Sequence, residues 1–259
     1  SGDLEPQPGP SAEQGASGGF AFNALLTGLA QSAVAIAAGI NAALLGARYP
    51  ASVETDGLFT AFAVYGMVVI ISASSRTALV PHLLDEQRSF RQFNEMLVAI
   101  LWAVPVIGLL FVFALPPAIT AATGDASSDI VRATLLILWP AAVGQFIAAL
   151  GAAMLGVLDD FHSAAFGYAG GGVTSVAAFL VLEPTIGLKA LPVAVLAGTC
   201  VMVAVVLGAL LKRGWRFGRI SLSPTIGWRW NKTLLMGSAY FIFGQSLYLV
   251  SVAVAAQAV

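Results

Sequence analysis

Long apolar stretches that contain almost no charged residue limit what this chain can fold into. We expect seven of them, near residues 20–45, 57–80, 93–115, 131–158, 163–182, 188–211 and 233–257. A helix needs about 20 apolar residues to cross the hydrocarbon core of a bilayer. Within that core only helices and closed barrels bond all their backbone groups, and no barrel-type alternation is visible here. The sequence therefore predicts an all-α membrane protein, a polytopic helical bundle of about seven transmembrane helices.

The composition supports a chain that faces lipid. Hydrophobic residues make up 58% of the 259 residues and charged residues 10%, whereas soluble domains carry about 25% charged residues. The net charge of −1 gives no indication of a nucleic-acid partner. The single cysteine, Cys200, lies in an apolar run, which excludes an internal disulfide and a cysteine-rich zinc site. We expect no metal and no cofactor.

Four regions are expected along the chain. Residues 1–19 are polar and rich in Pro, Gly and Ser, which predicts a disordered tail without the basic start of a signal peptide. A six-helix lobe follows over 20–211, and residues 233–259 would begin a second lobe. Between them, 212–232 carries six Lys and Arg residues, and we expect it to lie at the membrane interface. Its aromatic residues, expected at the headgroup level, are Trp215, Phe217, Trp228 and Trp230.

The distribution of basic residues predicts the orientation. The tail and the loops after the second, fourth and sixth predicted helices carry eight Lys and Arg residues, and the other side carries three, Arg48, Arg132 and Lys189. Because basic loops stay in the cytoplasm, we expect the N-terminus and the 212–232 linker to be cytoplasmic.

A weak internal repeat crosses the linker. Residues 25–39 (LLTGLAQSAVAIAAG) and 240–253 (YFIFGQSLYLVSVA) both place a Gly shortly before a Gln-Ser pair, at Gln31 and Gln245. This pattern suggests that the seventh helix starts a second copy of a six-helix unit, as in transporters built from repeats.

Two stretches carry a family resemblance. Residues 55–83 (TDGLFTAFAVYGMVVIISASSRTALVPHL) contain Asp56, Phe59, Ala61, Phe62, Val80 and Pro81 in matching positions. Residues 148–202 contain MLGVL and, later, GLKALPVA. In these segments the chain resembles the N-terminal half of the MviN/MurJ-type lipid flippases of the MOP (multidrug/oligosaccharidyl-lipid/polysaccharide) exporter superfamily.

The resemblance implies a function and a setting. It implies two six-helix lobes that face a central cavity and alternate access to it, with the second lobe downstream of this one. The substrate would be a lipid-linked envelope sugar precursor, either peptidoglycan lipid II or a related polyprenyl-(pyro)phosphate-linked oligosaccharide. The membrane would be the bacterial plasma (inner) membrane. A cation-coupled multidrug exporter of the same superfamily is the alternative, and a non-transporting membrane scaffold is a third.

Arg76 is the first candidate site residue. Flippases of this type that move lipid II carry arginines in their first two helices, whereas residues 20–47 of this chain contain no cation. Arg76 is the only cation well inside a predicted helix, since Arg132 and Lys189 lie at the starts of theirs. It would lie about 7.5 Å from a helix end placed just before Pro81. The side chain would then either contact a substrate phosphate or snorkel to the interface.

Uncharged polar residues within the apolar helices are further candidates for the substrate path. They are either partners in interhelical hydrogen bonds or residues that line a hydrated cavity, with Gln31 and Gln245 the better cavity candidates. The full set is Asn23, Gln31, Asn41, Gln145 and Gln245.

Three acids complete the list of candidates. Asp56 is expected to cap the second helix and Asp160 the fifth. The Asp159–Asp160 pair could instead couple transport to a cation or pair with Arg88 or Arg91. An enzyme is not expected, because no further acid follows this pair at the spacing needed for magnesium.

The last expectation concerns packing. Gly151 and Gly156 lie in the fourth predicted helix, and Gly167 and 170–172 lie in the fifth. Small residues let helix backbones approach closely, so these two helices are expected to pack tightly together.

Overall fold

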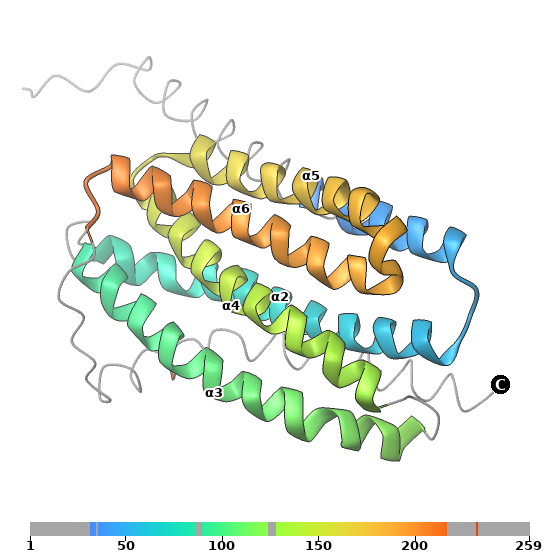
Figure 1. The fold of residues 1–259 in the computed structure, drawn as a ribbon. Helices are drawn as coiled ribbons and strands as arrows, with labels where there is room; N and C mark the ends of the chain where they lie inside the picture. The colour runs from blue at the N-terminus through green and yellow to red at the C-terminus, as the bar shows by residue number, and fades with distance from the viewer. Residues whose placement is uncertain (1–31, 35, 86–89, 124–127, 217–231, 233–259) are drawn as a thin grey trace, which may run out of the picture.

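The computed structural model describes residues 32–34, 36–85, 90–123, 128–216 and 232 (Figure 1). A helical segment, Ser32–Arg48, is followed by α2 (Val53–Asp85), α3 (Phe90–Thr123), α4 (Ser128–Val157) and α5 (Phe161–Ile186). The 3₁₀ turn η1 (Gly187–Lys189) then leads into α6 (Ala190–Lys212). Every regular element in the described part of the chain is helical. The predicted 20–31 and 233–257 regions lie outside it.

Three helical stretches among the described residues are long and apolar enough to cross a membrane. They are Val53–Ala73, Ser128–Val157 and the 52-residue stretch Phe161–Lys212, which contains both α5 and α6. The protein is therefore a membrane-embedded helical protein, and the count of seven helices stays a prediction.

Several helices continue past the prolines at which the sequence predicted an end. α2 runs through Pro81 to Asp85, α3 through Pro116 and Pro117 to Thr123, and α5 through Pro184 to Ile186. The predicted ends at 80, 115 and 182 were too early. Within a helical membrane bundle, neighbouring helices and local adjustments satisfy the carbonyls that a proline leaves free.

The start of α2 also differs from the prediction. Ser52, not Asp56, caps this helix, because its Oγ accepts a hydrogen bond from the backbone N–H of Thr55 at 3.2 Å. The helix begins three residues before Asp56, so Asp56 lies exposed in its first turn.

Helix α4 lies at the centre of the bundle. It packs against α2, α3 and α6, and α5 lies along α6 (Figure 1). The prediction of a tight α4–α5 contact was wrong, since these two helices touch only briefly. A Cβ on Gly151 would come within 2.4 Å of Val206, and one on Gly171 within 2.8 Å of the Gly198 carbonyl oxygen. The glycines thus bring both α4 and α5 against α6.

Candidate functional sites within and at the ends of the bundle

Arg76 lies on α2, and its side chain is outside the described part of the structure. Its backbone is helical, nine residues before the helix ends at Asp85. At 1.5 Å per residue, this places it about 13.5 Å from the helix end, farther than the 7.5 Å expected when Pro81 was taken as the end. Three other predicted path residues, Asn23, Gln31 and Gln245, also lie outside the described residues, as does Arg88.

Gln145 joins three helices near the middle of the bundle. Its Nε2 donates to the Tyr65 hydroxyl of α2 at 3.3 Å and to the Thr199 hydroxyl of α6 at 3.5 Å. The Thr199 hydroxyl donates in turn to the Val195 carbonyl at 2.9 Å. Tyr65 and Thr199 are buried and all three side chains are uncharged. The geometry is that of an interhelical hydrogen-bond network, the structural alternative considered for Gln145.

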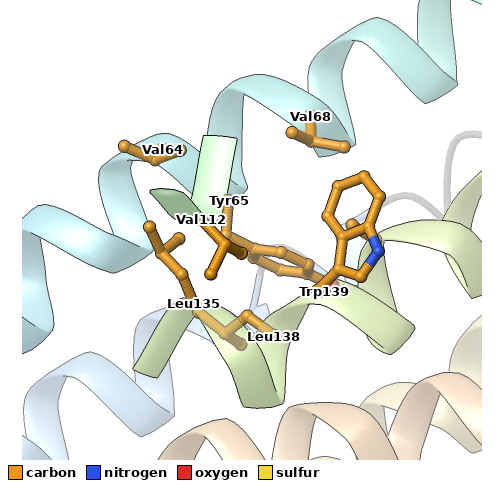
Figure 2. A pocket seen from close by; sticks show the side chains of 8 residues that line it. Val64, Tyr65, Val68, Val112, Leu135, Leu138 and Trp139 are labelled. Carbon is orange, nitrogen blue, oxygen red and sulfur yellow. The ribbon is translucent and has the colours of Figure 1, made fainter. Parts of the chain in front are cut away.

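A small apolar void lies beside this network. Figure 2 shows the rings of Tyr65 and Trp139 facing it, together with valine and leucine side chains from α2, α3 and α4. Its volume is about 20 Å³, room for about one water molecule. A substrate cannot enter a space of this size. The lining residues are Val64, Tyr65, Val68, Val112, Leu135, Leu138, Trp139 and Ala142.

Asn41 ties the Ser32–Arg48 helix to α5. Its Nδ2 donates to the hydroxyl of Ser175 at 3.2 Å, and both side chains are buried. The Asn41 Oδ1 is buried without a hydrogen-bond partner among the described residues. Close packing supports the contact, since a Cβ on Gly172 would lie 3.2 Å from Ala37.

A second polar contact between the Ser32–Arg48 helix and α5 was not predicted. Arg48 forms an ion pair with Glu183 of α5, and the Tyr49 hydroxyl donates to the other Glu183 carboxylate oxygen at 2.9 Å. The Glu183 side chain is 14% exposed and that of Arg48 43%. Burial, the hydrogen bond to Glu183 and the Glu183 charge raise the pKa of Tyr49, so its hydroxyl stays protonated as a donor. In sequence terms Arg48 and Glu183 each mark the end of an apolar run, but nothing in the spacing pairs them.

An open groove lies next to the Arg48–Glu183 ion pair. It has a volume of about 350 Å³ and is formed by the chain after Arg48 and by the α5–α6 turn. Its Tyr49 hydroxyl is already bonded to Glu183, and its Ser52 hydroxyl is bonded to Thr55. The lining residues are Tyr49, Pro50, Ser52, Glu54, Ile186, Gly187, Leu188 and Lys189.

Asp159 and Asp160 lie in the three-residue turn, 158–160, between α4 and α5. Asp159 adopts φ 58°, and the N–H groups of Asp159 and Asp160 donate to the carbonyls of Gly156 and Leu155. This is the Schellman arrangement, with an Asp in the left-handed position usually filled by Gly. Asp160 is also the N-cap of α5, since its Oδ1 accepts from the Ser163 N–H at 3.2 Å. The sequence had suggested this capping role for Asp160.

Asp160 also pairs with a cation from the chain after α6. Its Oδ2 lies 3.1 Å from a guanidinium nitrogen of Arg213. Burial alone would raise the pKa of Asp160, but the hydrogen bonds from Ser163 and the nearby Arg213 outweigh it and lower the pKa below its ordinary value. The stability that Asp160 contributes is therefore present at neutral pH, and it is lost as the pH falls through the lowered pKa.

Trp215, which was expected at the headgroup level, is buried within the protein at one end of the bundle. It is 1% exposed, its Nε1 donates to Asn94 Oδ1 of α3 at 2.8 Å, and it meets Phe93 edge to face with ring centroids 5.4 Å apart. The sequence did not predict these contacts, because aromatic and basic composition alone does not show that a neighbouring helix offers a buried acceptor, and the interfacial position of Trp215 stays a prediction. Phe217, Trp228 and Trp230 lie outside the described residues.

Charged residues lie near the ends of the described helices, with Arg76 as the exception. Arg48, Glu183, Glu54 and Lys189 occur at one end, whereas Arg91, Asp160 and Arg213 occur at the other. In the described part of the chain no group of three or more His, Cys, Asp or Glu residues could hold a metal ion.

No protein-family model matches the chain, and no curated protein matches it.

Proposed function

We propose that this chain is the N-terminal half of a bacterial membrane transporter that flips a lipid-linked sugar precursor from the inner to the outer leaflet. The substrate would carry a phosphate or pyrophosphate between its polyprenyl chain and its sugar. The two stretches that carry the resemblance lie in α2 and in α4–α6. In the bundle α2 and α6 pack against α4, and α5 packs against α6. A second six-helix lobe would complete the cavity, and transport would proceed by alternating access.

The observation that carries this proposal is the position of Arg76. Among the described residues it is the one charged residue well inside a helix, with 23 residues of α2 before it and nine after it. Arg76 follows the apolar span Val53–Ala73 by three residues on the same helix, and a charged residue at membrane depth is costly and therefore a functional candidate by default. An arginine suits a phosphate group, which its guanidinium can bind through two parallel hydrogen bonds. The chemistry therefore favours an anionic substrate.

The described carboxylates do not favour the cation-coupled multidrug alternative. Such an exporter needs an acid embedded in the membrane to carry its coupling ion. Glu183 lies three residues from the end of α5 and is bonded to Arg48 and Tyr49, and Asp56 lies exposed in the first turn of α2. The central Tyr65–Gln145–Thr199 network carries no charge.

A flipping assay tests the proposal directly. Vesicles that contain the full-length protein and a fluorescent undecaprenyl-diphosphate-linked sugar should lose fluorescence to an impermeant quencher faster than empty vesicles. A fluorescent lipid of similar length without phosphate serves as the matched substrate control and should move no faster than in empty vesicles. Equal rates for both lipids would remove the case for a phosphate-bearing substrate.

We also propose that the N-terminus and the 212–232 linker face the cytoplasm, because the loops on that side carry eight Lys and Arg residues against three. Single cysteines at Ser11 and at Ser221, in a Cys200→Ala background, should resist an impermeant thiol reagent in intact cells and react after lysis. A cysteine at Ser52 provides the outward-facing control. Labelling of Ser11 or Ser221 in intact cells would reverse the orientation.

A further inference from the structure

The chain leaving α6 turns back sharply onto the bundle. The Trp215 N–H donates to the Leu210 carbonyl at 3.0 Å, and the Gly214 N–H donates to the Leu211 carbonyl at 3.1 Å. Gly214 has φ 90°, a left-handed conformation that favours glycine. These bonds form a Schellman motif, which stops the helix and redirects the next residue. Trp215 is thereby aimed back at the bundle.

Trp215 enters the largest buried cluster of the described structure. The cluster also contains Met154 and Leu155 of α4, Leu210 of α6 and Phe93 of α3, all less than 2% exposed. The buried indole N–H has an acceptor in Asn94, so its burial leaves no donor unsatisfied. One side chain from the end of α6 therefore packs on the start of α3.

In the described part of the chain, α3 has few other contacts that would hold its start in place. Among the described helices its extensive packing is against α4, whereas α6 packs on both α4 and α5. Arg213, two residues before Trp215, forms its ion pair with Asp160 at the start of α5. Residues 213–215 thus touch the ends of three helices at one end of the bundle.

We propose that residues 213–215 are a latch that holds the start of α3 against α4, α5 and α6, and whose release lets this end of α3 separate from the bundle. The latch depends on no particular substrate. Residues 213–215 are part of the bundle, because Arg213 pairs with Asp160 and Trp215 is buried. Of the predicted 212–232 linker, Lys212 ends α6 and residues 213–215 form the latch.

Hydrogen exchange of the purified protein in lipid nanodiscs tests the latch. The Asn94→Ala variant leaves the buried indole N–H of Trp215 without its hydrogen-bond acceptor, and Trp215→Ala removes the ring. Losing one buried hydrogen bond corresponds to roughly a tenfold or larger change in a local opening equilibrium. We expect amide exchange over residues 90–100 to rise about tenfold in Asn94→Ala and further in Trp215→Ala, while α5 and the middle of α6 stay protected.

Trp102→Ala is the matched control, because Trp102 lies on the same helix but is 56% exposed. It should leave exchange over 90–100 unchanged. If Trp215→Ala does not accumulate as folded protein, Asn94→Ala decides the question, since it removes one acceptor only. Unchanged exchange over 90–100 in Asn94→Ala, or an equal rise with Trp102→Ala, would overturn the latch.

Discussion

Replacing Gly198 with alanine is expected to lower the stability of the bundle by about 1–3 kcal/mol, the usual range for overpacking a well-packed core. A Cβ at this position would lie 2.4 Å from the carbonyl oxygen of Gly171 and 2.9 Å from the Cβ of Ser175. The closest obstacle is backbone, so no rotamer change relieves the clash and α5 must move away from α6. Thermal unfolding in detergent micelles, followed by circular dichroism, measures the loss.

Gly208 provides the control on the same helix. A Cβ there meets nothing within 4 Å, so Gly208→Ala should be neutral or slightly stabilising, because alanine has the higher helix propensity. The effect of Gly198→Ala should extend to the Ser32–Arg48 helix, since Ser175 accepts the hydrogen bond from Asn41. Equal melting temperatures for the two variants would contradict the close α5–α6 contact.

The glycines illustrate what the sequence could and could not predict. Their abundance in the fourth and fifth apolar stretches correctly indicated close helix packing, but it could not identify the partner. A glycine marks a surface that another backbone can approach, and α6 contributes its own glycine, Gly198, opposite Gly171. Which helix approaches depends on how the whole bundle closes around α4, and local pattern does not contain that information.

Polar contacts between distant residues were the least predictable part of the candidate sites. The cap at Asp160 is local, and the run of acids before an apolar stretch was sufficient to suggest it. The Arg48–Glu183 pair and the Trp215–Asn94 bond join residues more than 100 positions apart. Each residue had a sufficient local interpretation, as a charge at a helix end or an interfacial aromatic residue, and only the packing shows its partner.

Arg76→Ala is expected to lower the initial rate of flipping of the diphosphate-linked lipid by roughly 10- to 100-fold. Hydrogen bonds to charged groups contribute about 1.5–3 kcal/mol, and the fixed cation would be absent from the path of the anion. Arg76→Lys should retain an intermediate rate, because a lysine supplies the charge but not the planar pair of donors. Both variants are compared with the parent in the vesicle assay, at equal protein density.

Lys189→Ala is the matched control, since Lys189 is an exposed cation in η1, at the other end of the bundle from the end of α2. It should flip the lipid at the parent rate. If Arg76 only snorkels to the interface, both Arg76 variants should also insert, accumulate and flip normally. Activity of Arg76→Ala at the parent rate would remove the anionic-substrate argument from this half of the protein, and the flippase proposal would then rest on the family resemblance.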